Sequence, residues 1–507
     1  MSEGLTRTER LLARLGRRSF LSLWSHANVY RDKGKELTDL LVVCHNIVLI
    51  FSDKEVAFDR ETVLPIAWPR WYNRAVKKSV PQLKRAKGWI ERHPDRLFFD
   101  AKCERPLGLL ESLKEPLEIH TIAVANGASS ACIDHFGGGS GSLMVSPLEG
   151  DNPDPFCLGV PTLVDGFVHV FDEGHLHVLL QELDTVRDFA DYLVAREKVI
   201  KGGNLYVSAS EEDLLAVYLK DVNEKGEHDF VWKSGVSLSG DQKIAVVEGS
   251  YKNLRKAKPY KEKKAADKIS YLWDRLIEKF THHLRSSSMV PVPAFLGQDG
   301  RGGEGEIGLR YMALQRRVER RSHAEAILGA FDILDGSKTN RFFRAMLPPP
   351  GSDSDTGFCI LLLKRDGVLS DLTYDQYREV RASTLAAYSE SLLEGNRNLR
   401  RVVGIATEGV RSGNMSEDLI YHEPPEWTDE AIAAAKERAK IHEIMGPNLK
   451  MRNYSTKEYP GHAAGLKRGS EYTEIPYRFI ERPPSPVTGQ PGNRKQRRAA
   501  KAKRRSR

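Results

Sequence analysis

The stretch from Gly34 to Lys54 decides the fold and reads GKELTDLLVVCHNIVLIFSDK. Two apolar runs are joined by His45 and Asn46, and charged residues stand at both outer ends. Apolar runs of this length, rich in β-branched residues and separated by two residues, are typical of a hairpin. The sequence therefore predicts two antiparallel strands whose open end carries the charges.

The position of the turn predicts the register of this hairpin. With the turn at the two central residues, Cys44 faces Ile47 and Asp39 faces Ser52 across the two strands. Because side chains alternate along a strand, Asp39, Ser52 and Lys54 share one face at the open end. A carboxylate beside a lysine on adjacent strands suits metal-assisted cleavage of a phosphodiester, in which the carboxylate holds the cation and the lysine steadies charge.

A second carboxylate can reach the same place. Glu36 stands three residues before Asp39 and can compensate from the other side of Asp39, whereas Asp53 alternates to the opposite face and is the poorer candidate. Carboxylate oxygens are the protein ligands that Mg²⁺ prefers. We therefore take Asp39 and Glu36 as the candidate ligands of Mg²⁺ or Mn²⁺.

The elements around the hairpin follow a recognisable order. Apolar spacing predicts a helix over residues 5–16, a basic helix over 68–92 and a strand over 117–126. This order, with Asp39 opening one strand and Lys54 closing its neighbour, resembles the PD-(D/E)XK superfamily, the fold of restriction endonucleases. The resemblance implies an α/β fold whose N-terminal core is a mixed sheet flanked by helices, followed here by further α+β regions.

The resemblance also implies roles for single residues. Asp39 takes the position of the metal-binding Asp, Lys54 that of the catalytic Lys, and Gln82 that of a glutamine on the helix behind the sheet. The activity that follows is divalent-metal-dependent endonuclease cleavage of DNA or RNA. A role in restriction or antiviral defence is associated with the superfamily and not with any residue of this chain.

Three positions depart from the pattern of the superfamily. Thr38 stands where a proline is common, Ser52 replaces the second carboxylate, and Ala86 stands where a tyrosine is expected. Ser52 is kept among the site residues because it occupies the carboxylate position. Its lack of charge leaves an alternative open, in which the chain is a catalytically inactive nuclease fold that binds nucleic acid or a protein. The choice depends on whether Glu36 supplies the missing carboxylate.

The predicted helix over residues 68–92 is strongly basic. We expect its cations to contact nucleic-acid phosphates without reading sequence, and the candidates are Arg70, Arg74, Lys77, Lys78, Lys84, Arg85 and Lys87. Trp68, Trp71 and Trp89 are interleaved with them and can stack on bases or pack in the core. Pro81 predicts a kink or a restart of the helix, with Ser79 as its cap. The alternative is an amphipathic helix with a solvated basic face.

Composition limits the other function classes. The net charge of +8 comes from the tail, because residues 494–507 hold nine Lys or Arg and no acid, which leaves about −1 for the remainder. The five cysteines are widely spaced, as in proteins of a reducing cytoplasm. No apolar stretch is long enough to cross a membrane, so we expect a cytoplasmic protein. A protein partner or a homo-oligomer stays open.

The chain is long enough for several domains. We expect a nuclease-like domain over 1–150, an α+β domain over 151–345, a smaller α/β region over 357–445, and a polar, basic, poorly ordered tail over 446–507. Within the second region, residues 162–171 and 175–180 read as strands, and 184–200 reads as a helix with Thr185 in its cap.

Overall fold

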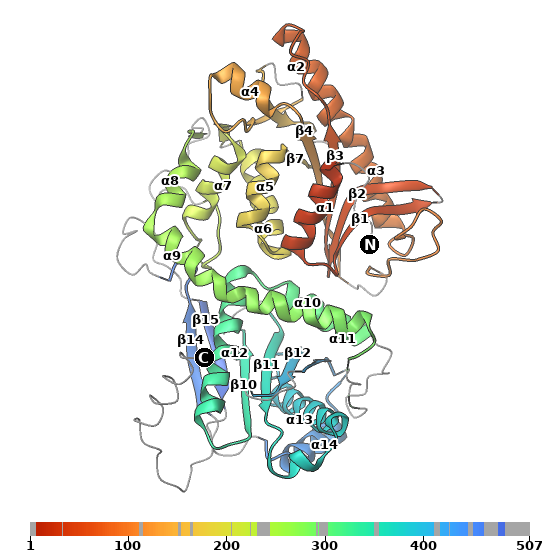
Figure 1. The fold of residues 1–507 in the computed structure, drawn as a ribbon, viewed down its shortest axis with the longest axis vertical. Helices are drawn as coiled ribbons and strands as arrows, with labels where there is room; N and C mark the ends of the chain where they lie inside the picture. The colour runs from red at the N-terminus through yellow and green to blue at the C-terminus, as the bar shows by residue number, and fades with distance from the viewer. Residues whose placement is uncertain are drawn as a thin grey trace, which may run out of the picture.

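The computed structural model describes most of the chain, in the residue ranges 7–32, 34–110, 115–150, 154–162, 166–203, 205–223, 225–230, 244–289, 293, 303–348, 354–409, 416–424, 426–444, 450–460 and 475–481. In these ranges the strands form three sheets, and helices lie between and outside them (Figure 1). The α/β class predicted from the sequence is confirmed.

The first sheet is built around the predicted hairpin. Its order is β1-β2-β3-β4-β7, with β1 (Ser25–Asp32), β2 (Lys35–Cys44), β3 (Ile47–Glu55), β4 (Glu118–Asn126) and β7 (Val168–Phe171). The first three strands are antiparallel, whereas β4 and β7 run parallel to β3. The sheet is therefore mixed. The expected boundary at residue 150 is wrong for this sheet, because β7 belongs to it.

The predicted register of the hairpin is confirmed. Cys44 pairs with Ile47, and regular pairing continues to Leu40 and Phe51. His45 has φ +53°, the left-handed backbone that a two-residue turn needs. Asp39 and Ser52 are the next residues along, where the regular pairing stops.

Helices cover both faces of the first sheet. One face packs on α1 (Arg7–Phe20), α5 (Glu173–Glu182) and α6 (Val186–Lys201), and the other on α2 (Leu64–Tyr72) and α3 (Ser79–Arg92). Alternate side chains of β2 supply the two cores, since Leu40 and Val42 join the first and Leu41 and Val43 the second. The predicted helix over 184–200 is α6, and Thr185 accepts a hydrogen bond from its first turn as expected. The strand expected over 175–180 is wrong, because these residues belong to α5.

The basic helix is longer than predicted and is interrupted. A π-helical turn (Asn73–Lys77) joins α2 to α3. Pro81 lies in the first turn of α3, where its missing N–H would have no helical acceptor anyway. The restart predicted at Pro81 is thus present, but Ser79 is not the cap, because its hydroxyl donates back to Ala75 O at 3.2 Å.

A small sheet and four helices continue the N-terminal half. The sheet has the order β6-β5-β8-β9, and its strands are β5 (Met144–Glu149), β6 (Cys157–Val160), β8 (Leu205–Ser208) and β9 (Ile244–Val246). The helices are α4 (Ser129–Phe136), α7 (Glu211–Lys220), α8 (Ser250–Lys256) and α9 (Lys258–Ala266).

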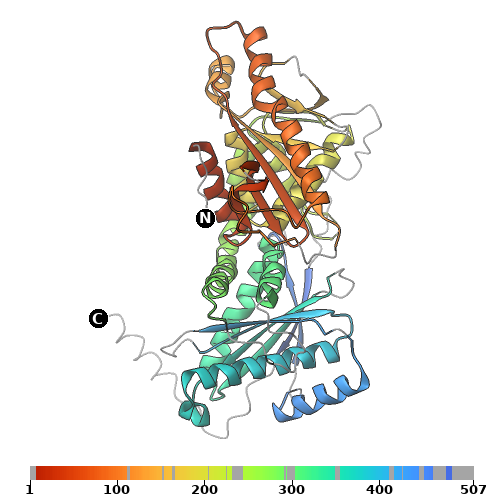
Figure 2. The same ribbon diagram turned by 90° about the vertical axis from the view of Figure 1, so that its right-hand side faces the viewer.

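The third sheet forms the C-terminal half. Its order is β13-β12-β11-β10-β15-β14, with β10 (Arg341–Leu347), β11 (Thr356–Leu363), β12 (Arg401–Thr407), β13 (Glu417–His422), β14 (Lys450–Thr456) and β15 (Ile475–Glu481). The helices α13 (Tyr374–Gly395) and α14 (Asp429–Ile441) cover its outer face (Figure 2). Two strands therefore lie in the expected disordered tail, which corrects that prediction, while the basic run 494–507 lies outside the described residues.

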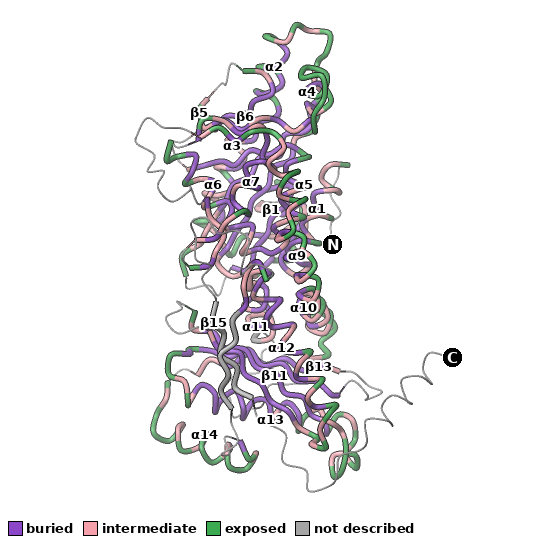
Figure 3. The backbone as a smooth tube through the Cα atoms, turned by 90° about the vertical axis from the view of Figure 1, so that its left-hand side faces the viewer, coloured by how far each residue is buried: buried purple, intermediate pink, exposed green. Residues whose placement is uncertain are grey.

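The two large sheets share one hydrophobic core. Three helices lie between them, namely α10 (Tyr271–Arg285), α11 (Gly303–Ala313) and α12 (Arg317–Gly336) (Figure 1). One continuous cluster of buried side chains runs from Leu12 in α1 through Trp273 in α10 to Tyr421 in β13. The buried backbone follows the strands and this middle layer (Figure 3). No helix in the described part of the chain is both long and apolar enough to cross a bilayer.

Candidate active site at the open end of the hairpin

The structure places Asp39 at the point where β2 and β3 part. Its carboxylate Oδ2 accepts a hydrogen bond from the backbone N–H of Asp53 at 2.5 Å, and Thr38 Oγ1 donates to Phe51 O at 2.5 Å. These two side chains therefore take over the bonds that backbone groups make further along the hairpin. Asp39 is only 7% exposed. The carboxylate is consequently fixed in position and largely shielded from water.

Ser52 and Gln82 meet on the α3 side of the sheet. The Ser52 hydroxyl donates to Gln82 Oε1 at 3.5 Å, and the serine is fully buried. Ala86, one helical turn further along α3, is also buried and packs in the core beneath the strands. The structure therefore brings together the strand and helix residues that the sequence selected, with an uncharged hydroxyl in the carboxylate position.

A β-bulge redirects Glu36. Val29 pairs with Thr38, but Tyr30 pairs with Glu36, so Leu37 is an extra residue in β2. A second shift follows, in which Asp32 pairs with Lys35, so alternation does not carry the face of Asp39 over to Glu36. The charge of Glu36 acts on the pKa of Asp39, which puts the two carboxylates in one neighbourhood. A carboxylate oxygen of Glu36 accepts a hydrogen bond from Asn28 Nδ2 at 2.5 Å. Glu36 is otherwise exposed at the edge of the site.

The charges of the site act on one another. Burial raises the pKa of Asp39 to about 7, the backbone N–H of Asp53 and the Lys54 cation oppose this, and Glu36 adds a smaller upward effect. Partial burial also raises the pKa of Glu36, against the hydrogen bond from Asn28 and the charge of Lys54. Lys54 is half-buried and forms no direct ion pair with any described residue. Its charge thus lies close enough to affect both carboxylates while its amino group stays unpaired.

The sequence did not single out Glu9, which belongs to the same neighbourhood. Glu9 lies in the first turn of α1, and its charge raises the pKa of Asp39, Glu36 and Asp53. On the α1 side of β3, Asp53 Oδ1 accepts a hydrogen bond from Asn126 Nδ2 at 2.7 Å. The signal available in the sequence was an acidic residue in the first turn of a helix, which is also the commonest place for a structural carboxylate.

The carboxylates of Asp39 and Glu36 suit a cation that retains several water ligands. Among the described residues, no group of three or more His, Cys, Asp or Glu side chains is close enough together to hold a metal ion. Mg²⁺ is usually bound through one or two carboxylates, with water and substrate phosphates completing its shell. Asp39 and Glu36, two carboxylates whose charges act on each other beside an unpaired lysine, fit this mode of binding and do not fit a closed structural metal site.

The basic surface next to the hairpin is partly what the sequence predicted. Arg70, Arg74, Lys78 and Arg85 are exposed, whereas Lys77, Lys84 and Lys87 are half-buried, Lys87 lying 3.9 Å from Glu91. Trp68 and Trp71 are buried in the core with ring centroids 5.2 Å apart. These two tryptophans follow the alternative that the sequence left open, whereas the cations of α2 and α3 lie at the surface or half-buried.

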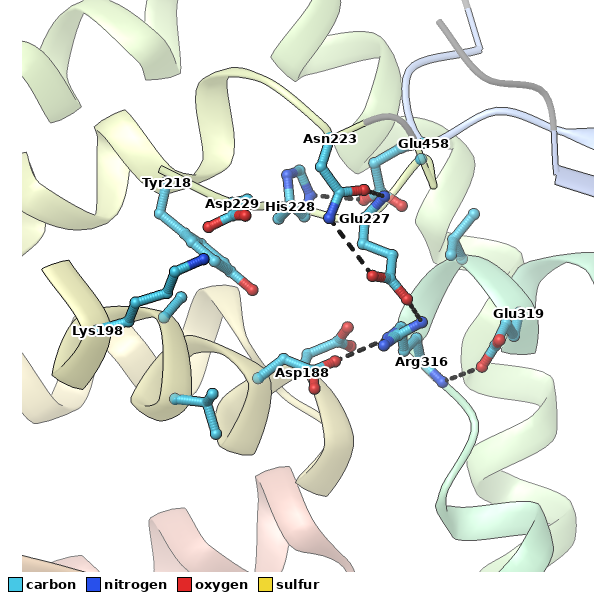
Figure 4. Close-up of a pocket in the computed structure, with 15 residues that line it drawn as sticks. Asp188, Lys198, Tyr218, Asn223, Glu227, His228, Asp229, Arg316, Glu319 and Glu458 are labelled. Carbon is cyan, nitrogen blue, oxygen red and sulfur yellow. Dashed lines mark hydrogen bonds and ion pairs between the residues drawn. The ribbon is translucent and has the colours of Figure 1, made fainter. Parts of the chain in front are cut away.

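A second cavity is formed by residues far along the chain from the hairpin, and six of its fifteen lining residues are Asp or Glu. It holds about 200 Å³ between α6, α7 and the start of α12 (Figure 4). Arg316 contacts Glu227 at 2.8 Å and Asp191 at 2.8 Å, and His228 contacts Glu458 at 3.0 Å. These contacts connect α6 and the start of α12 with the segment that follows α7, so we interpret the network as structural.

Comparisons with known protein families, curated proteins and solved structures find no significant match. The fold alone defines the class, which is a mixed α/β protein with two large helix-flanked sheets. Its function has to be argued from the residues of the hairpin site and their surroundings.

Proposed function

We propose that this chain is a divalent-metal-dependent nuclease that hydrolyses phosphodiester bonds in DNA or RNA. The observation that carries the proposal is the meeting of three charged groups at the open end of the hairpin, namely Asp39, Glu36 and Lys54. The charge of Lys54 lowers the pKa of both carboxylates, and the charge of Glu36 raises that of Asp39. These effects support the view that the three groups lie close together. A buried carboxylate, a rim carboxylate and an unpaired lysine suit a phosphate with a bound cation.

The order and pairing of the elements support the same proposal. A helix, three antiparallel strands, a helical segment and a fourth strand parallel to the third follow one another from α1 to β4. This arrangement resembles the restriction-endonuclease-like core, and by that association a role in restriction or antiviral defence is proposed. The basic face of α2 and α3 supplies cations for the phosphates on either side of the cleaved bond.

The roles of the residues follow from their positions. Asp39 and Glu36 would hold Mg²⁺ or Mn²⁺, which when bound polarises a phosphodiester and makes a bound water more acidic. Lys54 places a positive charge beside the phosphate and stabilises the negative charge that develops on it. Gln82, through its contact with Ser52, fixes the end of β3 from behind and is a positioning residue.

A second candidate function has its own observation. Ser52 is buried and bonded to Gln82, so β3 contributes no carboxylate to the face that carries Asp39. A site with one buried carboxylate holds a cation weakly if Glu36 stays with Asn28. In that case the chain would bind nucleic acid on α2 and α3 without cutting it, as a catalytically inactive member of the fold.

A cleavage assay separates these functions. Plasmid DNA and a single-stranded RNA are incubated with the protein in Mg²⁺, Mn²⁺ or EDTA. We expect cation-dependent cleavage by the wild type and a loss of at least about 100-fold in Asp39→Asn and in Lys54→Met, because each removes a charge needed at the reacting phosphate. Asp39→Asn keeps an oxygen that can accept the Asp53 N–H, so its fold should survive.

Matched controls use exposed residues away from the site. Asp429→Asn and Lys436→Met on α14, in the C-terminal half, change the same charges on the surface and should cleave like the wild type. Cleavage that persists in both site variants would refute the site assignment. Absence of cation-dependent cleavage by the wild type, together with retained binding of labelled DNA or RNA, would favour the binding module.

A further inference from the structure

A separate pocket lies beside the edge strand β1. It holds about 400 Å³ and is bounded by α1, β1, the end of α10 and the segment that follows α3. Its lining residues are Ala13, Arg17, Leu23, Ser25, His26, Ala27, Phe99, Arg105, Leu107, Leu109 and Arg285. None of the residues assigned to the hairpin site lines it, so the pocket is a distinct feature of the fold.

The lining carries positive charge and no carboxylate. Arg17, Arg105 and Arg285 reach it from three different segments. Arg17 Nε donates to Ala13 O at 3.3 Å, Arg285 Nη2 donates to Ser22 O at 3.1 Å, and Arg105 lies 3.5 Å from Asp100, which is outside the lining. A guanidinium has five N–H donors, so these contacts leave donors on Arg17 and Arg105 for an anion.

Two buried polar atoms of the wall have no partner in the described part of the chain. They are His26 Nε2 and Ser25 Oγ, on residues that are 8% and 4% exposed. Burial, and then the charge of Arg285, lowers the pKa of His26 to about 4, while its hydrogen bond to the backbone of Leu23 opposes this. His26 is therefore neutral at pH 7 and donates to Leu23, which leaves Nε2 as an acceptor. A buried acceptor without a donor costs free energy until something pairs with it.

The outer wall is apolar. Phe99 is 37% exposed although it is a large ring, and it meets the His26 ring edge-on with centroids 5.2 Å apart. Leu107 is buried beside it, and Leu109 is half-buried. A flat apolar group can pack on this side while an anionic group faces the arginines, which is the usual division of a small-molecule site.

We propose that this pocket binds a small organic anion whose phosphate or carboxylate lies between Arg17 and Arg105 and whose flat, N–H-bearing body packs on Phe99. Nucleoside monophosphates and aromatic carboxylates share this chemistry, and each carries an anionic end and a planar end. The N–H of the planar part donates to His26 Nε2, whereas Ser25 Oγ faces Gly16 of α1 and takes no part in the proposed contact. The proposal does not depend on the nuclease activity, because the pocket shares no residue with that site.

Calorimetric titration of the full chain tests the proposal. The probes are AMP, GMP, CMP and UMP for the phosphate source, indole-3-acetate for the carboxylate source, and inorganic phosphate for the anion alone. We expect at least one organic probe to bind with a Kd under about 1 mM. Arg17→Gln and Arg105→Gln should each weaken that binding about tenfold or more, since each removes a charge-assisted hydrogen bond. Phe99→Ala should weaken it as well.

The matched control is Arg14→Gln, which removes an exposed arginine from the same helix outside the pocket and should leave binding unchanged. A nucleotide that binds identifies a phosphate ligand, and indole-3-acetate alone identifies a carboxylate ligand. Three results would overturn the proposal: no probe binds the folded wild type, inorganic phosphate binds as tightly as every organic probe, or neither arginine variant weakens binding. Phe99→Ala keeps the test decisive if an arginine variant does not fold.

Discussion

At the scale of single residues, the interior holds ionisable groups that the sequence gives no reason to expect there. Arg196 and Glu211 are both buried, and two hydrogen bonds of 2.7 and 2.9 Å join them. Removing one partner of such a pair leaves an uncompensated buried charge, which is far more costly than losing a surface ion pair. This pair fixes how α6 and α7 lie against each other.

Buried histidines should make the protein sensitive to mild acid. His323 lies between the rings of Trp273 and Phe358, with centroid distances of 4.7 and 4.8 Å, and burial lowers its pKa to about 3. The unfolded chain has a histidine pKa near 6.5, so below that pH the unfolded state binds the extra proton. We expect the free energy of unfolding to fall by about 2 kcal/mol between pH 6.5 and 5 from this residue alone. Guanidinium titrations at both pH values measure it.

The variant His323→Phe keeps a ring between the same neighbours and cannot take up a proton. It should lose part of the pH dependence, although His26 and His422, whose pKa values burial lowers to about 4, keep some of it. The exposed His135→Phe is the control and should follow the wild type. If His323→Phe loses as much stability between pH 6.5 and 5 as the wild type does, the assignment is wrong.

The hairpin shows which site residues a sequence can reveal. Asp39, Ser52 and Lys54 follow from the alternation of one hairpin, and Gln82 from helical spacing on the element behind it. Glu9 and Asn28 could not be found in this way, because their approach depends on the packing of α1 and on a bulge in β2. Local periodicity predicts faces, whereas contacts between distant segments depend on the assembled core.

At the scale of elements, the basic face of α2 and α3 should govern binding of nucleic acid. The exposed side chains of Arg70, Arg74 and Arg85 point away from a core formed by their apolar neighbours. Replacing these three arginines by Gln should weaken binding of any DNA or RNA at low salt. The slope of log K against log salt should also decrease by about 2 to 3, since each lost phosphate contact releases fewer counterions. Fluorescence anisotropy across a salt series measures both quantities.

The control replaces three exposed lysines elsewhere, Lys258, Lys436 and Lys440, and changes the net charge by the same amount. A slope equal to that of the wild type is expected for this control. Equal slopes in the two triple variants would show that the interface is not on α2 and α3. A decrease confined to one sequence would instead indicate base readout.

Elements with a strong period were predicted well, and short ones were not. The hairpin and α6 follow their patterns. Residues 175–180 were misread because a short apolar run has no period that separates a buried strand from a helix, and here Asp172 caps a helix instead. The π-helical turn between α2 and α3 has no sequence signal beyond a nearby proline.

At the scale of the whole molecule, the expected domain boundaries do not divide the core. Composition placed breaks near residues 150 and 345, where loops are polar. Yet β7, which lies after residue 150, belongs to the first sheet. The strand β10 contains residue 345 and pairs with β11, which lies in the next expected region. Apolar side chains of α10 and α12 pack in the same cluster as both large sheets. Loop composition marks where the chain is exposed, but it does not tell which elements pack together.

A continuous core predicts that the C-terminal region cannot fold alone. A fragment of residues 357–445 loses β10, so β11 becomes an unpaired edge, and it exposes Phe358, Ile360 and Val403, which are buried in the shared core. We expect this fragment to show no cooperative unfolding by circular dichroism and to be digested rapidly by protease, because it has one helix-covered face and one bare apolar face. The full chain should resist the same protease and serves as the reference. A fragment that unfolds cooperatively and survives digestion would show that the third sheet is an independent domain, and that the helices α10 to α12 join two separate cores.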